Sequence, residues 1–217
     1  MNTKEKFVSL MSAGTDSPVA CYLMIKNGFT PIIVHFHLSP SNPLSDKILE
    51  EGLFRLIKIL RNYTDFSIKT YLIPHKQIIS QLEMHNFEKN ICIACRRMMY
   101  RIAKEIASME NAKAIVTGES LGEKASQTPK NLFVIKQAID NIIIIQPLIA
   151  LTKLEIEAIA KEIGTYEFSI QNTYKCSATP QYPVTHADLA KIKELEKTLN
   201  IRKIIEKSLE NASITSF

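Results

Sequence analysis

The 217-residue sequence has no tryptophan, only six glycines and only four cysteines. So little glycine excludes a collagen-like repeat, and so few cysteines exclude a disulfide-rich scaffold. No apolar run approaches the roughly 18 residues that a membrane-spanning helix needs, so we expect no membrane partner. The first ten residues, MNTKEKFVSL, lack the apolar segment of a signal peptide. We therefore expect a cytoplasmic protein, in which reduced cysteines bind metal or take part in chemistry.

The remaining composition is that of a globular protein. Hydrophobic residues make up 46% and charged residues 23%, which excludes a disordered chain. Lysine and arginine number 27 against 22 acidic residues, and the net charge of +5 permits an anionic partner such as RNA without establishing one. The length suits one large domain or two small ones. We see no linker or repeat, and we expect a single domain over residues 1–217, with a loop and helical extension from about residue 172.

Short apolar segments alternate with helical patterns of ten or more residues. The expected strands are 7–11, 31–37, 66–73, 112–116 and 142–145. The expected helices are 19–26, 46–60, 76–85, 92–109 and 152–163, with one or two more in 186–209. This alternation predicts an α/β fold, a doubly wound parallel sheet with helices on both faces. Ligands of such sheets bind beyond the carboxyl ends of the strands, which points to residues 12–17, 37–39 and 117–128.

Residues 12–17, SAGTDS, follow the first expected strand and open a helix. The small residues Ala13 and Gly14 let the backbone approach a ligand, and the N–H groups of a helix start favour an anion. Asp16 is out of place in an anion site unless it recruits Mg²⁺. The chain lacks both the P-loop kinase and the dinucleotide-binding motifs. The alternative is an ordinary tight turn before a helix.

Two of the cysteines, Cys92 and Cys95, form a C-x-x-C pair at the start of an expected helix. Their i,i+3 spacing puts both sulfurs on one helix face. The helix start, together with Arg96 and Arg97, is expected to lower the thiol pKa values.

The other two cysteines differ in setting. Cys176 lies in a loop before Pro180, a typical place for a functional residue, whereas Cys21 lies on an apolar helix and is interpreted as core. Three cysteines favour an iron–sulfur cluster with one open iron. A redox or persulfide pair, a structural role, and zinc completed by His75 or His85 remain open.

Residues 12–17, called the phosphate loop from here on, resemble the S-G-G-x-D-S signature of the PP-loop ATP pyrophosphatases, which split ATP into AMP and pyrophosphate. Ala13 stands where that family usually has glycine. Further strings follow in order: CRRMMYR at 95–101, TGESLGEKASQT at 117–128, QPLI at 146–149, TK at 152–153, and Cys176. Together they resemble the PP-loop catalytic domain of the tRNA 4-thiouridine synthases, the ThiI-type tRNA sulfurtransferases, in a stand-alone form. The resemblance covers most of the chain and implies the adenine nucleotide alpha hydrolase-like fold.

The resemblance implies an enzyme that uses ATP and Mg²⁺ to adenylate the C4 oxygen of a tRNA uracil, expected at position 8. Sulfur then replaces that oxygen to give 4-thiouridine. Asp16, Lys153 and Cys176 would be catalytic, with Asp16 on Mg²⁺. Three cysteines would hold an iron–sulfur cluster of [4Fe–4S] or [3Fe–4S] type, namely Cys92, Cys95 and Cys176. The nucleotide-binding residues would be Ser12, Ala13, Gly14, Thr15, Asp16, Ser17, His37, Leu38, Gly118, Gln127 and Thr128.

Two parts common in the family, an N-terminal THUMP-containing region and a C-terminal rhodanese domain, are not recognised in these residues. We therefore expect tRNA to bind a basic surface or a separate THUMP-type subunit, and sulfur to come from the cluster, free sulfide or a donor protein. A homodimer is a further expectation. The candidate basic residues, which can equally be ordinary solvated charges, are Arg96, Arg97, Arg101, Lys104 and Lys124. The alternative functions are a PP-loop enzyme for another substrate, such as a thiamine thiazole route or a small metabolite, and a non-catalytic sulfur-delivering partner.

Overall fold

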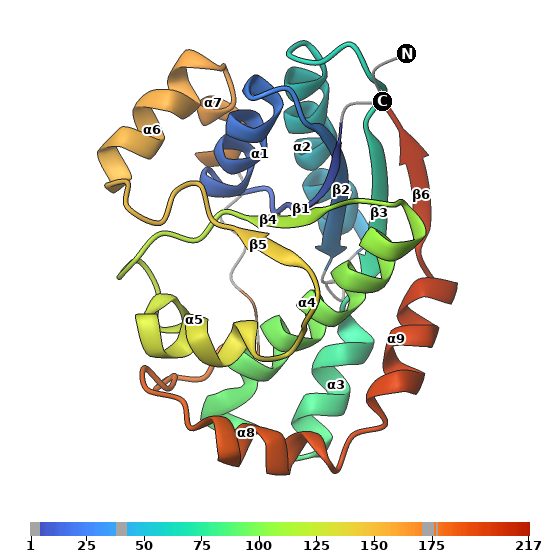
Figure 1. Cartoon of the computed structure of the whole chain (residues 1–217), viewed down its shortest axis with the longest axis vertical. Helices are drawn as coiled ribbons and strands as arrows, with labels where there is room; N and C mark the ends of the chain where they lie inside the picture. Colours follow the sequence, from blue (N-terminus) through green and yellow to red (C-terminus); the bar gives the residue numbers. More distant parts are fainter. Residues whose placement is uncertain (1–4, 38–42, 171–175, 177) are drawn as a thin grey trace.

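A six-stranded sheet forms the centre of the computed structural model, which describes residues 5–37, 43–170, 176 and 178–217 (Figure 1). Its strand order is β5-β4-β1-β2-β3-β6. Neighbouring strands are parallel except β6, which is antiparallel to β3. The strands are β1 (Lys6–Leu10), β2 (Thr30–His37), β3 (Lys69–Pro74), β4 (Ala114–Thr117), β5 (Ile143–Ile145) and β6 (Ser213–Ser216).

Helices cover both faces of the sheet (Figure 1). One face packs on α1 (Asp16–Lys26), α2 (Pro43–Arg61) and α6 (Lys153–Glu162), next to the short α7 (Tyr166–Ile170). The other packs on α3 (Lys76–Met84), α4 (Ile91–Met109) and α9 (Ile201–Glu210). Outside α4 lie α5 (Pro129–Lys136) and α8 (Leu189–Glu196), which share a third apolar cluster with it.

Alternation along the strands produces the two apolar layers. In β1, Phe7 faces the first layer and Val8 the second; in β2, Ile33 and Ile32 divide in the same way. All four side chains are at most 2% exposed. A strand buried on both faces is the expected form for a parallel sheet covered by helices.

The strand order reverses between β1 and β4, because β2 and β3 extend from one side of β1 while β4 and β5 extend from the other. Such a switch point opens a crevice at the carboxyl ends of the two central strands. The segment after β1 is the phosphate loop at 12–17, and the segment after β4 begins at Gly118. The topology therefore brings two of the three predicted ligand segments together.

The predicted fold class is confirmed, and every expected strand and helix is present with small shifts of its ends. The helices α5 and α7, the edge strand β6 and two short 3-10 helices, Glu88–Asn90 and Ala125–Gln127, were not predicted. The sheet is thus mixed, not purely parallel. No helix in the described part of the chain is long and apolar enough to cross a membrane.

Candidate functional site

The phosphate loop is closed by its own serines. The N–H of Ser12 donates to Ser17 Oγ at 2.8 Å, and the two hydroxyl oxygens lie 3.0 Å apart. Gly14 N–H donates weakly to Ser12 Oγ at 3.3 Å. Thr15 is the N-cap residue before α1, and its side chain does not cap the helix. The N–H groups of Asp16 and Ser17 therefore have no intrahelical acceptor and no capping side chain. Such free donors at a helix start form an anion site.

Gly118, the first residue after β4, lies directly against this loop. A Cβ at position 118 would be 2.7 Å from both the N and Cα of Ser17 and 2.9 Å from the carbonyl carbon of Asp16. These are backbone atoms, which cannot swing aside as a flexible side chain can. Only glycine therefore lets the β4 loop approach the phosphate loop this closely.

Lys153 reaches the same loop from α6. Its ammonium nitrogen donates to Asp16 Oδ1 at 2.5 Å. The helix start that carries Lys153 is fixed by a capping box, in which Thr152 and Glu155 bond each other's backbone N–H groups. From the neighbouring helix α7, Ser169 Oγ lies 3.2 Å from Thr15 Oγ1. Two of the three predicted catalytic residues thus meet in space.

Glu119, the residue after Gly118, is a buried carboxylate that the sequence analysis left without a role. Its side chain is 1% exposed and forms an ion pair with Arg96. Thr117 and Tyr100 donate their hydroxyls to it, and Gln146 Nε2 donates at 2.5 Å. The carboxylate therefore joins α4, β4 and the segment after β5. The sequence did contain a sign of this cluster, because Glu119 and its partners lie in the CRRMMYR, TGE and QPLI strings.

Gln127 is 3% exposed, and its Oε1 has no hydrogen-bond partner among the described residues. A buried, unpartnered carbonyl oxygen fits a site where a ligand N–H would bond it. Thr128 is occupied differently: its Oγ1 caps α5 by accepting from Asn131 N and donates to the carbonyl of Thr185. The predicted role of Thr128 in binding nucleotide remains a prediction.

The predicted site after β2 is described only in part. His37 ends β2, and its carbonyl accepts the N–H of His75 at 2.9 Å. Leu38 lies outside the described residues.

The three candidate cluster cysteines approach one another. Cys92 and Cys95 lie in the first turns of α4, and the charge of a Cys176 thiolate acts on both. Thr179, three residues after Cys176, lies near the Cys92 thiol and acts to lower its pKa. All four cysteines of the chain are free thiols. Among the described residues, no three His, Cys, Asp or Glu side chains are placed to hold a single metal ion.

His75 lies against Cys95, with Nε2 2.9 Å from the sulfur. Burial, with smaller effects of His35 and His37, lowers the pKa of His75 to about 4, so the ring is neutral at pH 7. Its Nδ1 is buried and has no partner in the described part of the chain. Of the two histidines considered as a fourth ligand, the structure brings this one to a cysteine, whereas His85 ends α3.

The predicted lowering of the thiol pKa values is wrong. Burial raises the pKa of both Cys92 and Cys95, and a neighbouring Cys176 thiolate raises them further. The charge of Arg96 lowers both values but does not outweigh burial. Without a bound metal these thiols are therefore protonated at pH 7, and metal binding would displace the protons. Cys21 is fully buried in the core as predicted, and burial raises its pKa to about 12.

The predicted basic surface is also wrong for three of its members. Arg97 is 1% exposed and forms two hydrogen bonds of 2.8 Å to Glu196 in α8. Arg101 adds two more to the same carboxylate, at 2.7 and 2.8 Å. Arg96 is bound to Glu119. All three arginines are thus engaged in ion pairs that tie α4 to α8 and to Glu119.

The remaining two predicted basic residues lie at the surface. Lys104 forms an ion pair with the exposed Asp140, and Lys124 is exposed.

The family model described as "Thiamine biosynthesis protein (ThiI)" matches residues 2–201. A "Probable tRNA sulfurtransferase" of Methanosarcina mazei is 39% identical over 218 residues, which cover 99% of this chain and 52% of that protein. One of the same description from Methanobrevibacter smithii is 36% identical over 212 residues, 97% of this chain and 55% of that protein. This chain thus spans about half the length of these curated relatives.

A solved structure described as a 4-thiouridine synthetase–RNA complex with bound ATP has a TM-score of 0.91 and 29% identity. The match covers 98% of this chain and 55% of that chain. The phosphate loop at the switch point and these matches over nearly the whole chain agree with the motif resemblance: the chain belongs to the ThiI family.

Proposed function

We propose that this chain is the catalytic part of an ATP-dependent tRNA sulfurtransferase that converts a uracil of tRNA, expected at position 8, to 4-thiouridine. One observation carries the proposal: the phosphate loop, Gly118 and the Lys153–Asp16 pair meet at the switch point of the sheet. The names of the relatives support tRNA as the substrate and sulfur transfer as the reaction.

The chemistry of this crevice suits a nucleotide. The phosphates would lie on the free N–H groups at the start of α1, and Asp16 would hold Mg²⁺, which neutralises phosphate charge. Gln127 Oε1, buried and unpartnered, would accept from the adenine amino group. The close approach of Gly118 to Ser17 keeps this wall of the crevice free of side chains.

In the first step the uracil C4 oxygen attacks the α-phosphorus of ATP, and pyrophosphate leaves. The free N–H groups of the loop and the Lys153 ammonium stabilise the negative charge that develops on the phosphate oxygens. A sulfur nucleophile then attacks C4, the C4–O bond breaks, and AMP leaves. If Cys176 carries a persulfide, its outer sulfur attacks C4, and a second thiol such as that of Cys95 then breaks the S–S bond to release 4-thiouridine. The two cysteines are left as a disulfide, which an external thiol reductant must reduce before the next turnover.

The three thiols also fit an iron–sulfur cluster, because soft sulfur donors are the ligands such clusters require. Cys92, Cys95 and Cys176 would hold it. These described residues are not placed to bind one metal ion together, but a cluster is larger than a single ion and its ligands lie further apart. Bound there, it would supply an iron able to carry sulfide. A separate THUMP-type subunit, a sulfur donor protein, a homodimer and a cytoplasmic location stay predictions.

The decisive experiment is a sulfur-transfer assay on anaerobic, cluster-reconstituted protein. The protein is given ATP, Mg²⁺, sulfide and an unmodified tRNA transcript, and digested nucleosides are examined by mass spectrometry. We expect 4-thiouridine that depends on ATP and is lost in Cys176→Ala. AMP without a thiolated base would contradict tRNA thiolation by this chain alone, and would favour either a PP-loop enzyme for another substrate or the need for a separate RNA-binding partner.

The ligand set has its own test. Anaerobically purified wild-type protein should contain iron and acid-labile sulfide, and the Cys92→Ala/Cys95→Ala/Cys176→Ala variant should not. Cys21→Ala is the matched control. Because Cys21 is buried in the core, away from the proposed ligands, the Cys21→Ala protein should keep the full iron content. Equal iron in the triple variant would refute this ligand set.

A further inference from the structure

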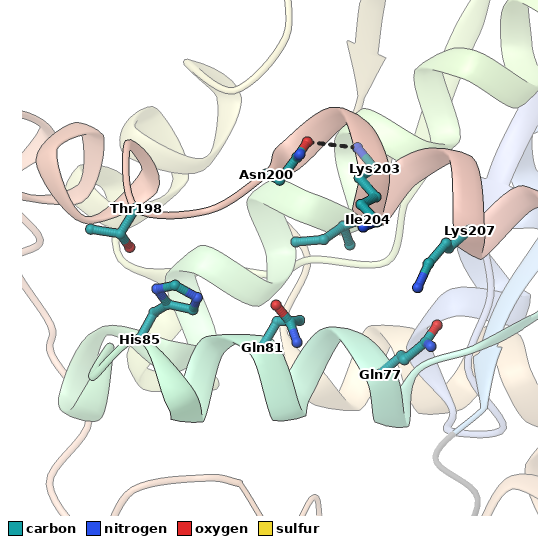
Figure 2. Close-up of a pocket in the computed structure, with 8 residues that line it drawn as sticks. All are labelled: Gln77, Gln81, His85, Thr198, Asn200, Lys203, Ile204 and Lys207. Atoms are coloured by element: carbon teal, nitrogen blue, oxygen red, sulfur yellow. Dashed lines mark hydrogen bonds between the residues drawn. The ribbon is translucent and has the colours of Figure 1, made fainter.

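A polar groove lies between α3 and α9, and the chemistry described above uses none of its side chains (Figure 2). Its volume is about 340 Å³. Gln77, Gln81 and His85 line it from one stripe of α3, at i, i+4 and i+8. Asn200, Lys203 and Lys207 line it from α9 and the residue before it. In Figure 2 the α3 side chains point toward α9, and the Lys207 side chain points back toward α3.

The lining offers hydrogen-bond donors and positive charge, and it includes no carboxylate. Neither Lys203 nor Lys207 forms an ion pair with any of the described residues. Glu206, on the same helix, is held instead by Arg202 at 2.8 Å. Asn200 Oδ1 accepts the N–H of Lys203, which leaves its amide donors free for a ligand. This combination suits an anion.

The dimensions favour a chain of phosphates over a single small anion. From Gln77 to His85 the groove follows eight residues of α3, about 12 Å at 1.5 Å per residue. Lys203 and Lys207 are one helical turn apart, so two charges are presented along its length. One end lies near the cysteines, because Gln77 is two residues from His75, which contacts Cys95.

We propose that the α3/α9 groove binds the sugar–phosphate backbone of RNA and leads the strand past the candidate cluster cysteines, Cys92, Cys95 and Cys176. The inference rests on the proposed function, since it takes tRNA as the substrate. It also supplies a basic surface in place of the arginines that the structure shows to be engaged in ion pairs.

The test compares two double variants with the same change in charge. Lys203→Gln/Lys207→Gln removes both groove charges, whereas Lys26→Gln/Lys58→Gln removes two exposed charges on α1 and α2, which cover the opposite face of the sheet. Binding of an unmodified tRNA transcript is measured by fluorescence anisotropy between about 50 and 200 mM salt. The groove variant should bind about tenfold more weakly, with a log–log salt slope shallower by about 1.4–1.8. The control variant should match the wild type.

Equal salt slopes in the two variants, or no measurable binding of tRNA by the wild-type chain, would overturn the proposal. Inorganic pyrophosphate separates a small-anion site from a backbone site. If pyrophosphate binding is lost in the groove variant while tRNA binding is unchanged, the RNA assignment is wrong. The sulfur-transfer assay keeps the two proposals distinct. If the groove variant makes 4-thiouridine at the wild-type rate, the proposed role of the groove is wrong and the proposed function stands. If tRNA binding depends on the groove but no 4-thiouridine forms, the proposed function is wrong and the groove proposal stands.

Discussion

Lys153 and Asp16 are 137 positions apart in the sequence, yet the Lys153 ammonium nitrogen lies 2.5 Å from Asp16 Oδ1. The side chains are 38% and 18% exposed, so the pair contributes less than about 1 kcal/mol to folding. Its importance is positional: the contact holds a cation beside the loop that would carry ATP phosphates. An ATP-bound Mg²⁺ would compete with Lys153 for Asp16 and free the ammonium for the phosphate.

We expect Lys153→Gln to lower AMP formation by about 100-fold or more, because it removes a cation that stabilises transition-state charge. The melting temperature should change by only a few degrees, since the pair is partly exposed. AMP release and thermal unfolding are measured on the same samples. Lys161→Gln is the control, because Lys161 is exposed on the same helix as Lys153. A similar loss of AMP in both variants would show that Lys153 has no special role.

Gly118→Ala tests the crevice wall. The added Cβ would lie 2.7 Å from Ser17 N and Cα, so the backbone of one loop must move. We expect a stability loss of about 1–3 kcal/mol in urea unfolding and at least about tenfold weaker binding of a non-hydrolysable ATP analogue by calorimetry.

Gly28→Ala is the matched control for this substitution, because Gly28 follows the C-cap of α1, away from the crevice. Gly28 has φ +89° and no atom within 4 Å of an added Cβ, so alanine should cost about 1 kcal/mol of backbone strain and leave ATP affinity unchanged. Equal nucleotide affinity in Gly118→Ala and Gly28→Ala would contradict the assignment of the crevice.

The carboxylate of Glu119 should be essential for stability. Glu119→Gln leaves Arg96 without its counter-charge in a buried setting, and we expect a loss of about 3–5 kcal/mol in urea unfolding. The Arg96→Met/Glu119→Gln double variant should recover part of that loss, because it no longer contains the unpaired cation. If the loss in the double variant equals the sum of the losses in Arg96→Met and Glu119→Gln alone, the pair is not coupled.

The sequence predicted the elements whose pattern is local. The alternation of strands and helices, and the position of SAGTDS after the first strand, were sufficient to predict the switch-point site. It did not predict β6, whose residues SITS carry little apolar pattern. That strand exists because β3 offers it an open edge, where Phe217 and Ile68 exchange backbone hydrogen bonds.

Side-chain partners distant in sequence were beyond the reach of pattern analysis. Arg97 looked like a solvated charge beside Cys95, but Glu196 lies 99 positions away in the chain and buries it. The thiol pKa values were mispredicted for a related reason: the sequence shows the nearby cation Arg96 but not the depth of burial that opposes it. Glu119 was missed because its four partners come from three separate segments.

The Glu196 carboxylate gives the folded protein a predictable sensitivity to acid. Burial alone would raise its pKa, but hydrogen bonds from Arg97 and Arg101 lower the pKa to about 2, from 4.5. The unfolded chain therefore binds this proton first as the pH falls. The associated stability is fully present above about pH 5 and is lost progressively toward pH 2, by about 3 kcal/mol in total.

Urea unfolding at several pH values between 7 and 2 measures this dependence in wild-type protein and in Glu196→Gln. At pH 7 the variant should already be about 3–5 kcal/mol less stable, since Arg97 loses its counter-charge. Its stability should then fall less steeply with acid than that of the wild type. Glu194→Gln is the control, because Glu194 is 68% exposed in its pair with Lys197 and should change little at any pH. If wild type and Glu196→Gln lose stability in parallel below pH 5, the acid sensitivity lies elsewhere and Glu196 is not the group that joins α8 to α4.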